Sequence, residues 1–366
     1  MDSIRKGKDK MSSYERVQMT LSFDMPDRVP IDYSANPVIH LKLLKALDLS
    51  DTDQLLNHLG VDFYPVDAEY KGPTIFPCVE GCTVNPEYGY CSRWVKNQYG
   101  GYHDFCSFPL QGADSDAISS WPLPNPDHYD YDSAISHLSS HKDKAIYIGH
   151  PGYMDIINSL GRLMGMDDCL INLQLRDEAT LEYIMHKTDF EIRKLERTIH
   201  KMREAGLKAS FLMLGEDLGT QISPMISHQL FDDVIRPILL QYLSFASALN
   251  LPVMIHTCGA SSWIYEDFIS MGVRAVDALQ PEAKDMGPDI LVSRFGGRLV
   301  FHGCISTAAI AELRPVEVSD LCCKTIDIMK PTQGYHFSPS HMIQDNTPIE
   351  NILAMYQAAH DHGIYP

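Results

Sequence analysis

Short apolar segments alternate with longer segments of helical periodicity, and this alternation constrains the fold more than any other feature of the sequence. We predict eight strands, which begin near residues 29, 61, 145, 208, 252, 275, 299 and 335. Each is followed by sequence with the spacing of an amphipathic helix. Eight strand–helix units predict an α/β fold, a single (β/α)8 TIM barrel over residues 1–366. An open, doubly wound sheet is the alternative, although no glycine-rich phosphate-binding motif follows the first strand.

Residues 70–128 interrupt this alternation between the second and third predicted strands. The segment is rich in glycine, proline and aromatic residues, and it contains four cysteines. Long connections inside a compact domain are usually functional or contain hairpins of their own, so we interpret this one as an excursion over the barrel mouth. Its cysteines lack the two-residue spacing of a zinc ribbon, and we therefore expect no second metal site there.

The composition limits the class of protein. With 45% hydrophobic and 21% charged residues, the chain resembles an ordinary globular protein. Its net charge of −18 argues against a nucleic-acid surface, which requires clustered cations. The sequence contains neither a long apolar span nor the apolar core of a secretory signal, so we expect a cytosolic protein without a membrane partner. Nine cysteines then favour free thiols or metal ligands over disulfides.

The segment Val253–Gly259 contains the most informative pair of residues. It ends a predicted strand, so His256 and Cys258 project to the same side, roughly 6–7 Å apart along the backbone. An imidazole and a thiolate at this spacing could share one ion, and zinc is the metal that suits them best. The pair could also be a buried thiol beside a hydrogen-bonded core histidine, and the two residues alone leave both interpretations open.

Barrel enzymes carry their chemistry at the carboxyl ends of the strands. In this sequence those ends are rich in imidazoles, thiols and carboxylates: Asp32, Tyr33, Asp62, Asp67, His150, Glu216, Asp217, His256, Cys258, Asp277, Gln280, His302, Cys304, Ser338, Ser340 and His341. Few of these residue types would be selected for packing. We therefore predict one ring of functional side chains around a common axis.

Within this ring we assign the metal ligands first. His341, at the end of the last strand, is the predicted third ligand beside His256 and Cys258, and Cys304 is the competing candidate. A catalytic zinc keeps one coordination position open for water or substrate. His302 is expected to face the helices instead of the site.

The carboxylates receive the remaining roles. Glu216 is a possible fourth ligand or a partner that orients His256. Glu216 or Asp217 is predicted to accept or donate a proton during catalysis. Substrate positioning is assigned to a further set of polar residues at the strand ends, which consists of Asp32, Tyr33, Asp62, Asp277 and Gln280.

Several ordered motifs resemble the uroporphyrinogen decarboxylase superfamily. They are Pro26-Asp27-Arg28-Val29-Pro30, Leu59-Gly60-Val61-Asp62-Phe63, Gly215-Glu216-Asp217-Leu218-Gly219-Thr220-Gln221, His256-Thr257-Cys258-Gly259, Phe301-His302-Gly303-Cys304-Ile305-Ser306, Ser338-Pro339-Ser340-His341 and Pro348-Ile349-Glu350-Asn351-Ile352. The resemblance implies a (β/α)8 barrel, in agreement with the strand count.

The resemblance is closer to the cobalamin-dependent methyltransferases than to the decarboxylases. Decarboxylases carry an N-terminal Arg-Gln-Ala-Gly-Arg-Tyr segment for their polycarboxylate substrate, which this chain lacks. In the methyltransferases a His-x-Cys pair and a distant cysteine bind zinc. His256 and Cys258 match the pair, whereas His341 stands at the place of the distant cysteine.

The methyltransferase resemblance implies zinc-dependent transfer of a methyl group between a small methylated compound or thiol and a corrinoid protein. Because the chain has no Asp-x-His-x-x-Gly cobalt-ligand motif, we expect the corrinoid on a partner protein that docks on residues 70–128. Two alternatives remain at this point. They are decarboxylation of a tetrapyrrole and a barrel that has lost catalysis and serves as a binding partner.

Overall fold

A computed structural model of the chain describes residues 4–7 and 9–366. Its central element is a parallel sheet of five strands in the order β12-β11-β10-β9-β8. The strands are β8 (Leu212–Gly215), β9 (Val253–His256), β10 (Ala275–Leu279), β11 (Val300–Ile305) and β12 (Tyr335–Pro339). Neighbours in the sheet are consecutive in the chain, and helical segments connect them, as the alternation in the sequence predicts.

Two further parallel strands extend this arrangement. Strand β1 (Phe63–Pro65) pairs with β7 (Ala145–Tyr147), and a single parallel bridge links Ile148 to Leu212 of β8. On the other side, Ile31 forms a parallel bridge with Phe337 of β12. The predicted parallel α/β architecture is confirmed. The first predicted strand is represented only by isolated bridges.

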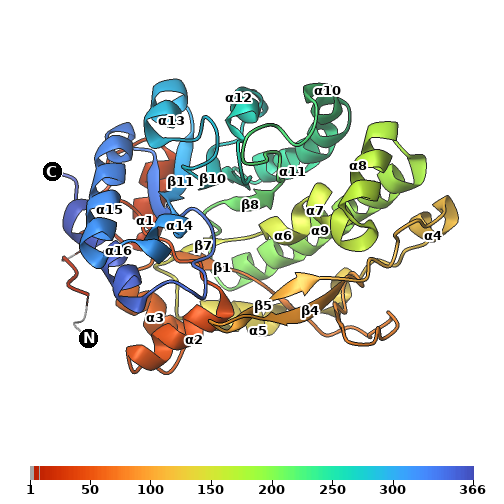
Figure 1. Ribbon diagram of the computed structural model, residues 1–366, viewed down its shortest axis with the longest axis horizontal. Helices are drawn as coiled ribbons and strands as arrows, with labels where there is room; N and C mark the ends of the chain where they lie inside the picture. Colours follow the sequence, from red (N-terminus) through yellow and green to blue (C-terminus); the bar gives the residue numbers. More distant parts are fainter. Residues whose placement is uncertain (1–3, 8) are drawn as a thin grey trace.

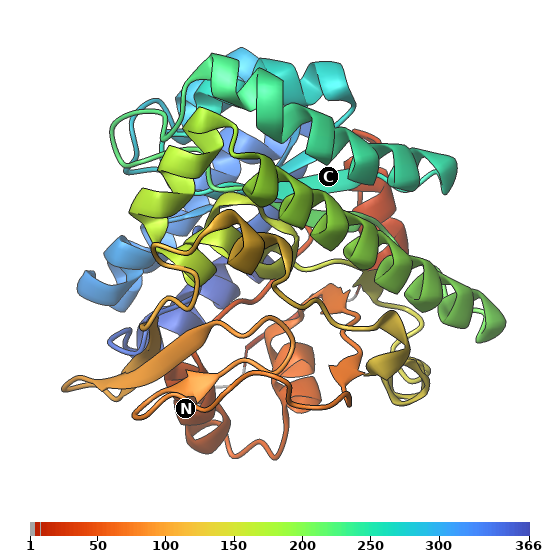
Figure 2. The same cartoon turned by 90° about the vertical axis from the view of Figure 1, so that its right-hand side faces the viewer.

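Helices lie outside the central strands (Figure 1). They are α1 (Ser13–Leu21), α2 (Pro37–Ala46), α3 (Thr52–Leu59), α4 (Ser115–Ser119), α5 (Tyr131–Leu138), α6 (Pro151–Met154), α7 (Ile157–Met164), α8 (Met166–Leu175), α9 (Glu178–Glu204), α10 (His228–Leu230), α11 (Arg236–Ala248), α12 (Tyr265–Met271), α13 (Pro288–Phe295), α14 (Thr307–Glu312), α15 (Pro315–Met329) and α16 (Ile349–His362). The long helices α9 and α11 run side by side (Figure 2). None of the helices in the described part of the chain combines the length and the apolar character that a bilayer span needs.

Side-chain caps explain where several helices begin. The Ser12 hydroxyl accepts a hydrogen bond from the Glu15 backbone N–H, and the Glu15 carboxylate accepts one from the Ser12 N–H. This reciprocal capping box satisfies backbone donors that have no partner within the helix. Asp51 and Asp177 cap α3 and α9 through single bonds to backbone N–H groups.

Helix α1 covers the amino ends of the strands. Its buried residues Val17 and Leu21 belong to one apolar cluster with residues at or next to the starts of central strands: Phe63, Ala145, Phe211, Met213, Met254, Ala275 and Val300. Packed apolar side chains thus cover the middle of this end, whereas barrel enzymes carry their chemistry at the carboxyl ends of the strands.

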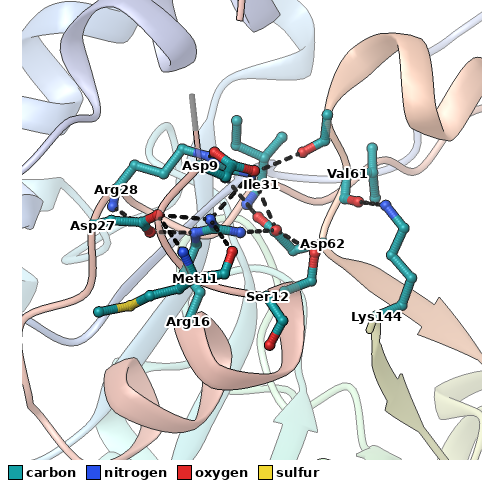
Figure 3. A network of polar contacts seen from close by, with 12 residues as sticks. Asp9, Met11, Ser12, Arg16, Asp27, Arg28, Ile31, Val61, Asp62 and Lys144 are labelled. Atoms are coloured by element: carbon teal, nitrogen blue, oxygen red, sulfur yellow. Dashed lines mark hydrogen bonds and ion pairs between the residues drawn. The ribbon is translucent and has the colours of Figure 1, made fainter. Parts of the chain in front are cut away.

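A buried ionic network fixes α1 at that amino end (Figure 3). Asp62, which is fully buried, accepts hydrogen bonds from the Arg16 Nη1 (2.6 Å) and Arg28 Nη1 (2.7 Å) atoms. The Ile31 backbone N–H donates a further bond of 2.8 Å to it. Burial alone would raise the pKa of Asp62, but the two guanidinium groups outweigh this effect and lower it. The predicted substrate-positioning role of Asp62 is therefore wrong, because this residue precedes β1 instead of ending it.

Residues 70–128 carry antiparallel strands of their own. Strands β3 (Thr83–Val84), β4 (Cys91–Lys96) and β5 (Gly101–Phe105) form a three-stranded antiparallel sheet, drawn in orange in Figure 1. At the base, β2 (Glu69–Tyr70) pairs with β6 (Tyr129–Asp130). The base pairing brings the two ends of this excursion together, so the chain leaves and re-enters the central fold at one place.

Candidate metal centre

The centre is built around His256, the last residue of β9, and Cys258, two residues later. The His256 Nε2 atom lies 3.3 Å from the Cys258 sulfur. Both residues are partly exposed, and 24% of the His256 side chain is accessible. The two side chains thus lie on one side, as the strand spacing predicts, and both can reach a ligand from solvent.

Asp217 supplies a third donor atom from the loop after β8. Its Oδ1 atom accepts a 2.8 Å hydrogen bond from the Cys258 backbone N–H and lies 3.9 Å from His256 Nε2. One donor atom from each of Asp217, His256 and Cys258 can be chosen so that all three lie within 4.8 Å of one another. Ligands of a tetrahedral zinc ion are roughly 3.4–3.6 Å apart, so the three atoms fit zinc after small shifts.

Asp277 of β10 holds the other side of the His256 ring. Its Oδ2 atom lies 2.6 Å from His256 Nδ1, which leaves Nε2 directed toward Cys258. A carboxylate behind a histidine is the usual second partner of a metal-binding imidazole, because it fixes the tautomer and the ring orientation. The assignment of Asp277 to substrate positioning is thereby replaced by a role in orienting His256.

Electrostatic interactions among these residues shift their pKa values. Burial would lower the pKa of His256, but the hydrogen bonds to Asp277 and Cys258 raise it well above 6.5. Burial raises the pKa of the Cys258 thiol, and His256 offsets only part of this rise. The His256 imidazolium in turn lowers the pKa of Asp277. A metal ion that binds His256 and Cys258 would compete with protons for both side chains.

The chain is conformationally unusual next to Asp277. Ala278 has a φ of +62°, and the register between β10 and β11 shifts between Asp277 and Leu279. A residue with a side chain seldom adopts this left-handed conformation, and such residues concentrate at functional sites. The bulge interrupts the strand ladder immediately after the carboxylate that contacts His256.

Two loops meet closely beside Cys258. Gly259 has a φ of +71°, and a Cβ atom built on it would lie 2.4 Å from the Gly219 carbonyl oxygen. The Ala260 N–H donates a 2.7 Å hydrogen bond to the Thr220 carbonyl. Only glycine permits this approach, which fixes the Asp217 loop against the Cys258 loop.

A chain of polar contacts extends the centre to the first and last strand segments. His302 Nε2 lies 3.1 Å from Asp32 Oδ2 and 3.7 Å from Asp277 Oδ1. Burial lowers the pKa of His302, but the carboxylates of Asp32 and Asp277 outweigh burial and raise it. His302 therefore faces the centre, and the expectation that it faces the helices is wrong.

His336 of β12 was not among the site residues predicted from the sequence. Its Nδ1 atom lies 3.2 Å from His302 Nδ1, and its fully buried Nε2 atom has no hydrogen-bond partner. Burial and the neighbouring His302 hold the pKa of His336 well below 6.5. His302 and His336 occupy paired positions on adjacent strands, which is the one signal that could have linked them.

Glu216 is not part of this centre. Its fully buried carboxylate accepts hydrogen bonds from the backbone N–H groups of Ile156 (2.8 Å) and Ile157 (3.1 Å) at the start of α7. Burial and the nearby Asp155 raise its pKa well above 4.5. Successive residues of an extended chain point to opposite sides, so Asp217 faces the centre while Glu216 faces the helices. The predicted catalytic and His256-orienting roles of Glu216 are therefore not supported.

The two candidates for a third sulfur or nitrogen ligand lie apart from the group. His341 is exposed, and its Nδ1 atom lies 3.5 Å from Gln344 Nε2. Cys304 is 2% exposed, and burial raises the pKa of its thiol. Among the described residues, the donor atoms that lie close to those of His256 and Cys258 belong to Asp217. His341 and Cys304 thus lie outside this group of donor atoms, and Asp217 lies within it.

The remaining substrate candidates divide into two groups. Asp32 contacts His302 and thereby joins the centre. Tyr33 instead points toward α2, where its hydroxyl lies 3.1 Å from His40 Nδ1. Gln280 is half-buried, and its side-chain oxygen accepts a 3.1 Å hydrogen bond from Gln221, which follows β8. The Asp32 side chain thus reaches the centre and Gln280 lies on a neighbouring loop, whereas the Tyr33 side chain contacts α2.

Comparison with protein families adds an independent observation. Residues 193–362, which include His256, Cys258, Asp277 and His302, match the family described as Uroporphyrinogen decarboxylase (URO-D). The resemblance to the uroporphyrinogen decarboxylase superfamily is confirmed. The match to this superfamily spans the strands from β8 to β12 and therefore contains the whole metal-binding group.

Similar solved structures extend the comparison to the fold of nearly the whole chain. A structure described as a methyltransferase from Methanosarcina mazei has a TM-score of 0.62 and 16% sequence identity, and the match covers 96% of this chain and 99% of that one. A B12-independent methionine synthase from Shewanella sp. W3-18-1, in complex with selenomethionine, has a TM-score of 0.38 and 10% identity over 92% of each chain. The second similarity is too weak to support an argument. No curated protein sequence matches the chain significantly.

Proposed function

We propose that this protein is a zinc-dependent methyltransferase that moves a methyl group between a small methylated compound or thiol and a corrinoid protein. The observation that carries the proposal is the convergence of His256 Nε2, Cys258 Sγ and an Asp217 carboxylate oxygen. A nitrogen, sulfur and oxygen donor set with room for a fourth ligand is the composition of a catalytic zinc site.

In the proposed site His256, Cys258 and Asp217 hold the zinc ion. When bound, zinc would supply Lewis-acid chemistry, because it removes the proton of a thiol substrate at neutral pH or polarises the oxygen of an ether. Asp277 keeps the Nδ1 proton of His256 and so directs Nε2 inward. Asn158 orients Asp217 through a 2.9 Å hydrogen bond from its Nδ2 atom to Oδ2.

Other residues of the chain would position the substrate and hold its proton. The His302 Nε2 atom, between Asp32 and Asp277, is placed to keep a proton near the centre. Gln280 and Gln221 are linked by a hydrogen bond and stand at the ends of two neighbouring strand loops. We assign His302 to proton storage and Gln280 to substrate orientation.

The proposal includes a complete (β/α)8 barrel. Its support is a series of backbone contacts that includes the parallel bridges at Ile31 and Ile148 and a 2.8 Å hydrogen bond from the Asp62 N–H to the Ile31 carbonyl. The fold similarity to the protein described as a methyltransferase from Methanosarcina mazei supports the methyltransferase branch. The corrinoid would arrive on a partner protein that docks on residues 70–128, where Trp94, Tyr102 and Phe105 are exposed.

Decarboxylation of a tetrapyrrole is the second candidate, because the matching family is described by that activity. A substrate with many carboxylates requires cations, yet Arg16 and Arg28 are engaged by Asp62 at the opposite end of the strands. Asp32, Asp217 and Asp277 make the candidate centre acidic, which opposes a polyanion. The geometry thus favours methyl transfer. If the protein is a non-catalytic barrel, neither methyl transfer nor tetrapyrrole decarboxylation should be detected.

Zinc analysis combined with a methyl-transfer assay tests the proposal. The double variant His256→Ala/Cys258→Ala should hold one zinc equivalent fewer than the wild type and should lose methyl transfer between methylcobalamin and a thiol. Cys323→Ala removes a half-buried thiol on α15 and serves as the control. Equal zinc content in wild type and double variant would contradict the proposal, and uroporphyrinogen turnover by metal-free protein would support decarboxylation instead.

A further inference from the structure

A second group of metal-binding side chains lies between α3 and the end of α5. It consists of Asp53, His137 and His141, one donor atom of each lying within 4.8 Å of the others. His137 lies in the last turn of α5, and His141 follows the end of that helix at Leu138 by three residues. His141 is buried, with 8% of its side chain accessible, whereas His137 is exposed to 58% and gives solvent access to the group.

The separations of the donor atoms suit zinc. The Asp53 Oδ2 atom lies 3.2 Å from His141 Nε2 and 3.9 Å from His137 Nε2. Nitrogen and oxygen ligands of a tetrahedral zinc ion are roughly 3.4 Å apart, which lies between these two values. An ion could therefore enter this group after movements of the side chains, of which His137 is the most exposed.

The proton positions around His141 leave its Nε2 atom facing a carboxylate. The Ser140 hydroxyl donates to the His137 carbonyl (3.0 Å), so it can only accept from His141 Nδ1, 2.9 Å away. The His137 carbonyl, 3.2 Å from the same Nδ1 atom, is also an acceptor. With its proton on Nδ1, a neutral His141 directs the Nε2 lone pair at Asp53. A cation, either a proton or a metal ion, must lie between them.

Tyr64 completes the group on the protein side. Its hydroxyl lies 2.6 Å from Asp53 Oδ1 and 2.6 Å from His137 Nε2. Its ring packs against the His141 ring, with centroids 4.2 Å apart. The hydroxyl carries one proton and donates it to Asp53 Oδ1, so it accepts the proton of His137 Nε2. It fixes the orientation of Asp53 without occupying Oδ2, and a metal ion bound at His137 Nε2 would replace the proton there. Tyr64 thus positions a ligand of the group.

A third group, formed by His228, Asp232 and Asp267, shows what distinguishes this one. There Arg236 forms ion pairs with both Asp232 and Asp267, so a side-chain cation already lies between the carboxylates. In the described residues, Asp53 has ion-pair partners only in the two histidines. The balance of charge thus favours an added cation at Asp53.

We propose that Asp53, His137 and His141 bind a zinc ion that joins α3 to α5. These helices precede and follow the excursion at residues 70–128, so the ion would link the two chain segments that flank it. This site shares no residue with the candidate metal centre, and the proposal does not depend on the proposed methyl transfer. Three protein ligands leave a fourth position for water.

Cobalt titration in a background without the first centre tests this site. The His256→Ala/Cys258→Ala chain should still bind one equivalent of cobalt or zinc. Its cobalt spectrum should show tetrahedral d–d bands without thiolate charge transfer, because the second site has no sulfur ligand. Zinc should also raise the melting temperature of this chain.

Adding His137→Ala to the same background should abolish that equivalent and the zinc-dependent rise in melting temperature. Since His137 is exposed, this variant should fold, and His141→Gln provides a second test. His362→Ala is the matched control, because His362 pairs with Asp327 at 2.6 Å without a second histidine. Absence of metal binding in the background chain, or equal binding after His137→Ala, would overturn the proposal and leave a proton between Asp53 and His141.

Discussion

The Nδ1 atom of His256 lies 2.6 Å from the Asp277 carboxylate, and this contact determines which ring nitrogen is offered to a ligand. The two residues stand in register on adjacent parallel strands, β9 and β10. Their pairing is therefore built into the sheet and does not depend on a mobile loop. The opposite nitrogen, Nε2, is consequently held toward Cys258 and Asp217.

Replacing Asp277 by asparagine should weaken metal binding at His256. The amide cannot stabilise the imidazole with a negative charge, and loss of such a partner typically lowers affinity about 10–100-fold. The cobalt–thiolate absorption of Cys258, titrated against a chelator, measures this affinity. Asp327→Asn is the control, since Asp327 contacts the surface residue His362 at the same distance of 2.6 Å. Equal affinity in the wild type and Asp277→Asn would show that the contact has no such role.

The third ligand can be identified by comparing Asp217→Ala with His341→Ala. Asp217 lies within the donor group, whereas His341 is exposed beside Gln344. We expect Asp217→Ala to reduce zinc affinity more than the roughly 10–100-fold loss of an orienting partner, and His341→Ala to leave it unchanged. The cobalt–thiolate titration measures both. The reverse order would restore His341 as the ligand.

Gly259→Ala should disturb the centre through the backbone. An added methyl group would approach the Gly219 carbonyl oxygen to 2.4 Å and would force the loops after β8 and β9 apart. Gly272→Ala is the control, because Gly272 also has a positive φ (+91°) but an added Cβ would meet no atom within 4 Å. Each variant should lose about 1–2 kcal/mol from left-handed strain, and only Gly259→Ala should lose metal. Thermal unfolding and zinc analysis distinguish the two effects.

Asp62→Ala should destabilise the fold strongly. It leaves the buried guanidinium groups of Arg16 and Arg28 without their shared carboxylate, and removing one partner of a buried ion pair typically costs about 3–5 kcal/mol. Urea unfolding measures the free energy. Glu266→Ala, which breaks the exposed pair with Arg298, should change the midpoint little. A small effect of Asp62→Ala would show that water or a neighbouring residue compensates for the lost charge.

The same network predicts how stability depends on acid. Burial would raise the pKa of Asp27, but hydrogen bonds from Arg16 and the Lys10 backbone lower it from 3.8 to about 2. A carboxyl group with a lowered folded-state pKa stabilises the protein above its unfolded value, and this contribution disappears as the pH falls through the folded value. Between about pH 4 and pH 2, the wild type should therefore lose stability more steeply than Asp27→Asn. Urea midpoints across this range, with the exposed Asp24→Asn as control, provide the measurement.

Much of the fold could be predicted because strands and helices leave different periodicities in the sequence. The strands β7 and β9 to β12 begin close to the predicted residues, and helical segments follow each of them as predicted. Helix α14 (Thr307–Glu312) was not predicted, since a six-residue helix has too few turns to show a period. The first strand is reduced to bridges because Pro30 removes a backbone donor beside Ile31.

The candidate site was harder to predict because it depends on which side each strand end faces. A shift of one residue exchanges the two faces, and for this reason Glu216 was assigned a role that the geometry gives to Asp217 and Asp277. Asp62 was wrongly grouped with the residues at the carboxyl ends, although it follows the predicted strand start near residue 61 by one residue and directly precedes β1. The contact between His302 and His336 joins adjacent strands, which no local pattern of residues predicts.

The short ladder between Glu69–Tyr70 and Asp130–Tyr129 has an evolutionary consequence. It holds the two ends of residues 71–128 together. Sequence can therefore be gained, lost or exchanged within this segment without changing the register of the central strands. The surface of this segment can therefore diverge between descendants of such a chain while the residues at the strand ends are retained.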